Sequence, residues 1–205
     1  MGEGYGPMII SKEKMTVEEA KNKVFAIPGV GTSAYLSLRL ALGDVDYKVV
    51  PFDEIMPSIK SGKYDVGVII HEGQLTWKDE GVNLVLDLGI WWNEKTGLPL
   101  PLGGNVVRKD LGLEMCGKIT KDVRNSIEHS LSNPEDALEF AKEWGRGIDD
   151  ETNEEFVGMY VNKRTLDYGD DGREAIRLFL RKGQEIGMVR SNLDVDSIVF
   201  VGSGE

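Results

Sequence analysis

The sequence predicts an α/β protein, because apolar runs with the length of strands alternate with stretches that carry helix start signals. The expected strands are residues 8–11, 24–27, 47–50 and 64–70. The last of them ends in Val66-Gly67-Val68-Ile69-Ile70, a nearly continuous apolar run that is typical of a strand buried on both faces. Strands that alternate with helices predict a parallel sheet with right-handed crossover connections.

Each helix between these strands begins with a residue suited to its first turn. Thr16-Val17-Glu18-Glu19 has the form of a capping box, in which a threonine and a glutamate satisfy free backbone amides. Thr32 or Ser33 is expected to cap the second helix, and Asp53 the third. These elements predict that residues 1–112 form one α/β lobe that includes hinge strands.

The pattern becomes helical after residue 112. Before that point, we expect strands at 84–88 and 105–109, a helical turn at 91–95 and an irregular proline- and glycine-rich segment at 97–104. Beyond it, we expect helices over 114–131, from Pro134 with Gly145 after its end, from about Asp150, and over 172–182. Residues 113–205 are therefore expected to form a helical region that packs on the lobes.

The composition argues against several classes of partner. Thirty-five acidic and 24 basic residues give a net charge of −11, which repels phosphate backbones and anionic membranes, so neither nucleic acid nor membrane is an expected partner. No apolar run approaches the roughly 20 residues of a membrane helix, and residues 1–7 lack the basic region and apolar core of a signal peptide. With Cys116 as the single cysteine, we expect a cytoplasmic protein without disulfides.

The first candidate site is the turn Pro28-Gly29-Val30-Gly31, between an expected strand and an expected helix. Its glycines permit close approach of a ligand, and the helix start presents free amides and a positive potential. With the hydroxyls of Thr32 and Ser33, this segment suits a carboxylate or a phosphate. An ordinary tight turn with a hydroxyl cap explains the same residues equally well.

The same turn also fits a second functional interpretation. Gly29-x-Gly31-x-x-Ala34 is a dinucleotide-binding fingerprint, and Asp53 stands where the ribose-binding acid would follow the next strand. This interpretation predicts an oxidoreductase that uses a nicotinamide cofactor. Against it, the pattern is short and common, and Pro28 directly precedes the turn.

The second candidate site is His71, which stands just past the carboxyl end of the apolar run 66–70. Open α/β sheets bind ligands at this end of their strands, and an imidazole can take and return a proton near neutral pH. Glu72 is placed either to orient His71 or to face solvent. A histidine hydrogen-bonded in a polar rim is the ordinary alternative. The other histidine, His129, is expected to be a solvated helix residue.

Trp91 and Trp92 form a third feature with two interpretations. The pair could stack on an aromatic ligand, but such residues more often pack a core or an interface.

Two separated histidines and one cysteine do not make a metal site. We therefore expect neither a metal nor a cofactor.

Seven blocks of the sequence together resemble one enzyme family. They are Gly6-Pro7-Met8-Ile9-Ile10, residues 27–35, residues 52–55, Ile69-Ile70-His71-Glu72, Asp87-Leu88-Gly89-x-Trp91-Trp92, residues 96–103 and Tyr160-Val161-Asn162. In this order and as a set, they resemble 1,4-dihydroxy-6-naphthoate synthase of the futalosine route to menaquinone.

The resemblance implies a fold, a reaction and roles for three residues. The fold would be of the type II periplasmic-binding-protein class, with two α/β lobes around a cleft. The reaction would be that of a carbon–carbon lyase, converting cyclic dehypoxanthine futalosine to 1,4-dihydroxy-6-naphthoate. The resemblance assigns His71 as the proton acceptor and Thr32 and Ser33 as hydroxyls that bind the small anionic substrate. A non-catalytic solute receptor of the same fold is the main alternative.

One departure from the family affects what we expect of this chain. Family members begin with a further segment that carries a second substrate-binding stretch, and this sequence lacks it. We therefore expect one largely complete α/β lobe with C-terminal helices and most of the first lobe missing. Little activity is expected without the opposing cleft wall, and the uncovered lobe surface is expected to favour homo-oligomers.

Overall fold

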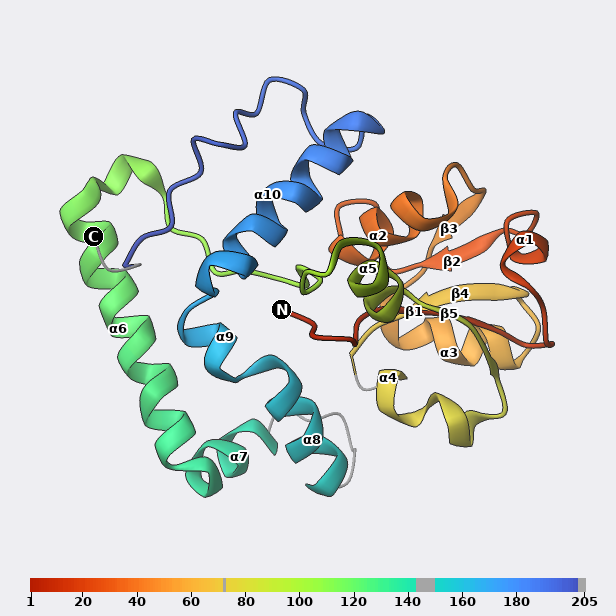
Figure 1. Ribbon diagram of the computed structural model, residues 1–205. Helices are drawn as coiled ribbons and strands as arrows, with labels where there is room; N and C mark the ends of the chain where they lie inside the picture. The colour runs from red at the N-terminus through yellow and green to blue at the C-terminus, as the bar shows by residue number, and fades with distance from the viewer. Residues whose placement is uncertain (72, 143–149, 203–205) are drawn as a thin grey trace.

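A five-stranded sheet lies at the centre of residues 1–112 in the computed structural model (Figure 1). The structure describes residues 1–71, 73–142 and 150–202. In chain order the strands are β1 (Met8–Ser11), β2 (Phe25–Ile27), β3 (Tyr47–Val49), β4 (Val66–Ile69) and β5 (Asn83–Asp87). They lie side by side in the order β3-β2-β4-β1-β5, and the predicted α/β class is confirmed.

The sheet is mixed, and the prediction of a parallel sheet was wrong for one strand. β2 pairs in parallel with both β3 and β4, whereas β1 is antiparallel to its neighbours β4 and β5. The three parallel strands are joined by crossover helices, as the alternation of elements predicted. β1 is inserted between β4 and β5 in the opposite direction, and like β4 it is largely buried and apolar.

Helices cover both faces of the sheet. They are α1 (Val17–Ala20), α2 (Ser33–Leu42), α3 (Phe52–Lys60), α4 (Gly73–Thr76) and the 3₁₀ turn η1 (Trp77–Glu80). One core joins α1 and α2 to one face through side chains such as Phe25, Leu38 and Val68, and a second joins α3 to the other through Ala26, Ile55 and Ile59. Successive strand residues alternate between the two cores, so both faces of the sheet are covered by apolar side chains, as expected of the run 66–70.

Local signals placed most helix starts correctly. Thr16 forms the predicted capping box with Glu19, and Thr32 caps α2. Asp53 does not cap α3: Pro51 holds the cap position, so Asp53 lies in the first turn, where a carboxylate still favours the helix dipole. The expected strand at 105–109 is also absent from this described segment, because residues 101–108 are irregular and the 3₁₀ turn η2 (Lys109–Leu111) follows.

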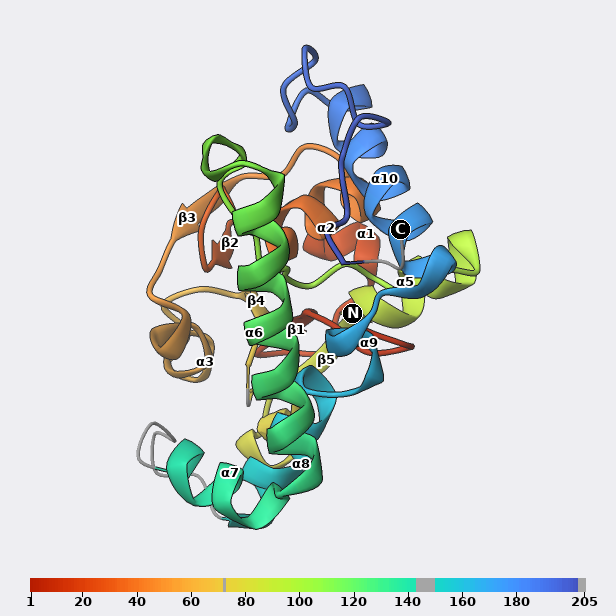
Figure 2. The same ribbon diagram turned by 90° about the vertical axis from the view of Figure 1, so that its left-hand side faces the viewer.

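The remaining elements are helices. They are α5 (Leu88–Thr96), α6 (Leu113–Ser132), α7 (Pro134–Lys142), α8 (Asp150–Tyr160), α9 (Lys163–Leu166) and α10 (Gly169–Glu185). The expected stop at Gly145 lies outside the described residues. α6 stands on the side of the molecule away from the sheet in Figure 1 and therefore lies in front of it in the turned view of Figure 2, whereas α10 packs against α2. The division into domains at residue 112 stays a prediction.

A third core fixes α10 to the α/β lobe. Trp92 is 1% exposed and meets Phe179 edge-on, with ring centroids 5.3 Å apart. Its indole Nε1–H donates to the Pro99 carbonyl at 3.1 Å, which satisfies a polar atom that burial would otherwise leave unpaired. Trp91 packs at the border of this core. The tryptophan pair therefore has the structural role that was the ordinary interpretation.

Candidate active site

Three segments with candidate functional residues follow the carboxyl ends of three neighbouring strands. The turn 28–33 follows β2, Phe52 follows β3, and His71 follows β4. These strands are parallel and adjacent, with Phe25 of β2 opposite Tyr47 of β3 and Val66 of β4. Their carboxyl ends therefore meet at one edge of the sheet, which is where open α/β sheets bind ligands.

His71 has an unusual backbone and an aromatic surrounding. Its φ is 56°, and it is the one non-glycine residue with a positive φ in the described part of the chain. Its half-buried imidazole lies 4.5 Å from the Phe52 ring and 6.0 Å from the Phe156 ring, measured between centroids. A left-handed conformation disfavours most side chains and often marks a functional position. Glu72, which was considered as its partner, lies outside the described residues.

Gln74 belongs to this site, although sequence reasoning did not single it out. Its side chain is 4% exposed and lies within hydrogen-bond distance of the Tyr160 hydroxyl, at 2.8 Å. The backbone N–H of Gln74 donates to the carbonyl of His71 at 3.1 Å. Gln74 is the second residue of α4 and does not hold the glutamine position of a capping box, so the sequence carried no clear signal for it.

Thr32 and Ser33 are both engaged with the protein. The Thr32 hydroxyl donates to the Gly29 carbonyl at 2.7 Å and accepts from the Tyr35 backbone N–H at 3.1 Å. The Ser33 hydroxyl donates to the Leu102 carbonyl, which attaches the turn to the segment 97–103. Thr32 is therefore a helix cap in this structure, and its binding role stays a prediction. An anion here would be met first by amides of the first turn of α2.

Asp53, the acid of the dinucleotide interpretation, lies in the first turn of α3. It lines a cavity of about 680 Å³ between α3 and residues 69–80, together with Phe52, Met56 and Thr76. None of the residues 28–34, all of which the structure describes, lines this cavity. The cavity alone does not decide between a dinucleotide site and an ordinary turn at residues 28–34, so the nicotinamide interpretation stays a prediction.

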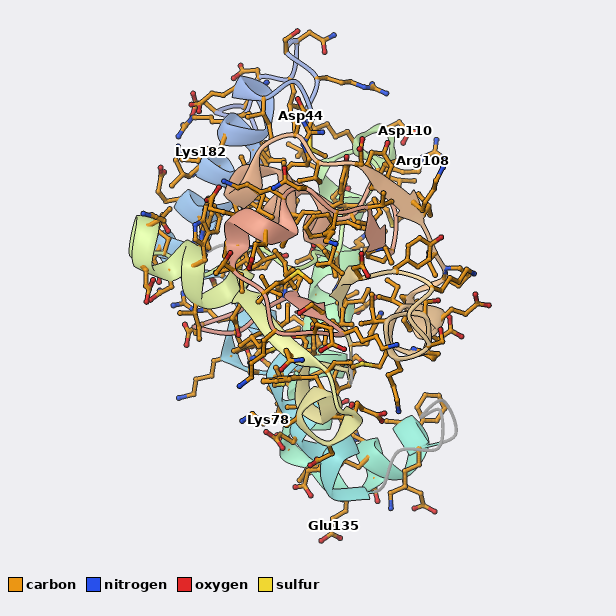
Figure 3. The ribbon with its side chains drawn as sticks, turned by 90° about the vertical axis from the view of Figure 1, so that its right-hand side faces the viewer. Asp44, Lys78, Arg108, Asp110, Glu135 and Lys182 are labelled. Carbon is orange, nitrogen blue, oxygen red and sulfur yellow. The ribbon has the colours of Figure 1, made fainter. Side chains whose placement is uncertain are left out.

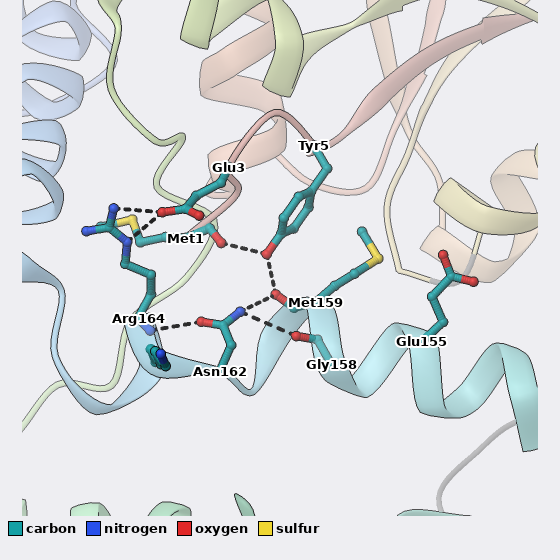
Figure 4. A pocket seen from close by; sticks show the side chains of 9 residues that line it. Met1, Glu3, Tyr5, Glu155, Gly158, Met159, Asn162 and Arg164 are labelled. Atoms are coloured by element: carbon teal, nitrogen blue, oxygen red, sulfur yellow. Dashed lines mark hydrogen bonds and ion pairs between the residues drawn. The ribbon is translucent and has the colours of Figure 1, made fainter.

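A second cavity lies between the N-terminal segment and helices α8 and α9, with a volume of about 610 Å³ (Figure 4). The Tyr5 hydroxyl contacts the carbonyls of Met1, at 2.9 Å, and Met159, and burial raises the pKa of Tyr5. Arg164 binds Glu3 and Asp171. The hydrogen bonds from Arg164 lower the pKa of Asp171. These pairs attach the N-terminal segment to α9 and α10.

The other polar candidates are remote from the sheet edge. His129 is exposed on α6, as expected, and charged residues such as Lys78 and Glu135 point outward from the surface (Figure 3). Among the described residues, no group of three or more His, Cys, Asp or Glu side chains is arranged to hold a metal. In the same part of the chain, no helix is both long enough and apolar enough to cross a membrane.

Sequence comparisons find relatives along nearly the whole chain. A family model described as "Menaquinone biosynthesis" matches residues 1–185. A 1,4-dihydroxy-6-naphthoate synthase of Streptomyces coelicolor is 32% identical over 206 residues, which cover 98% of this chain and 72% of that protein. One of Thermus thermophilus is 38% identical over 181 residues, covering 87% of this chain and 65% of that protein.

Solved structures show the same relationship at the level of the fold. A protein of Archaeoglobus fulgidus superposes with a TM-score of 0.86 at 37% identity, over 92% of this chain and 70% of that one. A chain described as a periplasmic sulfonate-binding protein of a Methylobacillus flagellatus ABC transporter gives a TM-score of 0.64 at 15% identity, over 98% and 64%. The second likeness concerns the fold alone, and it confirms the predicted periplasmic-binding-protein-like architecture.

Proposed function

This chain belongs to the menaquinone biosynthesis family, and we propose that it carries out the reaction of the 1,4-dihydroxy-6-naphthoate synthases with His71 as general base. The substrate would be cyclic dehypoxanthine futalosine, and the enzyme would act as a carbon–carbon lyase. The chain spans 72% and 65% of the two synthases that it resembles.

The position of His71 is the observation that supports the proposed role best. The residue follows the central strand β4 at the edge where the ends of β2 and β3 also lie. Formation of an aromatic product requires that carbon-bound protons leave the substrate, and an imidazole is suited to accept one. The flat apolar faces of Phe52 and Phe156 beside the imidazole suit the planar bicyclic ring of the naphthoate product.

We further propose that the turn 28–33 holds the anionic end of the substrate. The first-turn amides of α2 and the helix dipole attract an anion, and the hydroxyls of Thr32 and Ser33 supply further donors. In the structure these hydroxyls donate to the carbonyls of Gly29 and Leu102. Binding would therefore require each hydroxyl to rotate from a carbonyl to the substrate.

The alternative function is a solute receptor without chemistry. The likeness to a sulfonate-binding protein concerns the fold, and a receptor has no use for a base in a left-handed conformation at the sheet edge. Incubation of the purified chain with cyclic dehypoxanthine futalosine, followed by chromatography and mass spectrometry, tests the proposal. Appearance of 1,4-dihydroxy-6-naphthoate supports the synthase, and saturable binding of the substrate without product supports the receptor.

A further inference from the structure

Gln74 holds the backbone of His71 at both of its polar groups. Its own backbone N–H donates to the His71 carbonyl at 3.1 Å. Its side-chain amide lies where the oxygen accepts from the His71 backbone N–H at 3.2 Å and from the Tyr160 hydroxyl at 2.8 Å, while the nitrogen donates to the Gly6 carbonyl at 2.7 Å. The hydrogen-bond partners decide which amide atom of Gln74 is the oxygen. If the two atoms were exchanged, the oxygen would face acceptors and the nitrogen would face donors.

This pairing matters because His71 has a conformation that its own side chain disfavours. A left-handed backbone is disfavoured for a residue with a Cβ, and neighbouring contacts must stabilise it. The glutamine side chain reaches back from the second residue of α4 to the backbone N–H three residues earlier. At 4% exposure, the amide of Gln74 is shielded from competing water, which strengthens these hydrogen bonds.

The contacts of Gln74 also lead through Tyr160 and Phe156 back to the imidazole of His71. Tyr160, which pairs with the Gln74 amide, packs on Phe156 with ring centroids 4.8 Å apart. Phe156 in turn lies 6.0 Å from the His71 ring. The backbone of His71 and one wall of its aromatic surrounding are thus fixed by the same side chain, which is itself attached to Gly6 at the start of β1.

We infer that Gln74 is the positioning residue for His71, setting both the backbone conformation that presents the imidazole and the place of α8 beside it. The inference rests on the proposed function for its catalytic consequence. Gln74 does not touch the reacting atoms in this account. Its loss should therefore lower kcat by about 10–100-fold, because a displacement of about 1 Å at a reacting group has an effect of that size, and KM should change little.

The experiment compares Gln74→Leu with the matched control Gln184→Leu, in a His129→Gln background that leaves His71 as the only imidazole. Gln184 also fixes backbone, donating to the carbonyls of Arg190 and Leu193 at 2.9 and 2.8 Å, but it lies on α10. Two signals are read by NMR: hydrogen exchange of the His71 amide, and the imidazole proton shifts that the adjacent Phe52 ring displaces. Steady-state kinetics are measured on the same proteins.

We expect the unsubstituted protein to protect the His71 amide and to show ring-shifted imidazole protons. Gln74→Leu should lose both signals together with kcat, and Gln184→Leu should keep all three. Fast exchange of the His71 amide in the unsubstituted protein, or unchanged imidazole shifts in Gln74→Leu, would overturn the inference, and the first test requires no variant to fold. Failure of the proposed function is distinct: the unsubstituted protein would form no product while both NMR signals still depended on Gln74.

Discussion

A Cβ atom built on Gly89 would lie 2.1 Å from the carbonyl carbon of Tyr5. It would also lie 2.6 Å from the amide nitrogen of Gly6, so both obstacles are backbone and neither can rotate away. Gly89→Ala must therefore separate the N-terminal segment from α5. We expect this variant to lose about 1–3 kcal/mol of unfolding free energy, measured by denaturant unfolding.

Gly117→Ala is the control for this prediction. Gly117 lies within α6, and a Cβ there meets nothing within 4 Å. Because alanine favours helices over glycine by up to about 1 kcal/mol, this variant should be slightly more stable than the unsubstituted protein. Equal effects of the two substitutions would show that the close approach at Gly89 does not constrain the fold.

His71→Asn should abolish most of the proposed turnover and leave the fold intact. Asparagine tolerates positive φ better than most residues, so the backbone conformation can persist without the imidazole. Loss of a general base typically lowers kcat by about 10²–10⁴-fold. His129→Asn removes the other histidine, which is exposed on α6, and should leave kcat unchanged. Turnover by His71→Asn at the unsubstituted rate would contradict the assignment.

Substitutions at Thr32 and Ser33 should show which hydroxyl stabilises the fold and which binds the substrate. Thr32→Ala removes the cap to the Tyr35 amide, so unfolding free energy should fall by about 1 kcal/mol, whereas Thr32→Ser should retain it. Both Thr32→Ala and Ser33→Ala should weaken binding of the substrate by about 1–3 kcal/mol, measured by calorimetry. Unchanged affinity in both variants would leave the turn with a capping role alone.

Asp87 should make stability depend on pH in a defined direction. Burial raises the pKa of this carboxyl, against the opposing effect of hydrogen bonds from the amides of Ile90 and Gly89. The folded state then holds its proton to higher pH than the unfolded state, so unfolding free energy from this group falls as pH rises from about 3.9 through the folded pKa.

Asp87→Asn tests this linkage, because its side-chain oxygen can still accept from both amides. Thermal unfolding is measured between about pH 3 and about pH 8, a window that begins below the ordinary carboxyl pKa of about 3.9. The unsubstituted protein should lose stability relative to the variant as pH rises through that window. A stability difference that is independent of pH across it would sink the assignment.

The apolar side chains exposed on α6 and α7 should promote self-association. Leu113 is 80% exposed and Phe140 is 65% exposed, and exposed apolar side chains favour contacts between copies. The double variant Leu113→Glu/Phe140→Glu should lower the mass measured by light scattering. Ile90→Glu, at a residue that is 46% exposed on α5, should not. A monomer at all concentrations in the unsubstituted protein would contradict this expectation.

The sequence predicted the parts of the fold that local signals determine. Buried strands such as 66–69 and the caps at Thr16 and Thr32 follow from residue type and spacing. The direction of β1 could not be predicted, because its apolar residues suit either orientation and only its partners decide it. The roles of Gln74 and Phe156 at the site escaped sequence reasoning for the same reason, since each acquires its meaning from contacts made across the fold.

The placement of β1 between β4 and β5 has a consequence for how the chain acquires its structure. Met8 has its strand partners at Ile69 and Asp87. This apolar strand precedes both partners in the chain, so it must remain unpaired until β4 has been synthesised and lacks its second partner until β5 follows. Such distant pairings slow folding, because a long loop must close before any contact rewards it. The segment 8–11 is accordingly the place where a chaperone would be expected to bind the nascent chain.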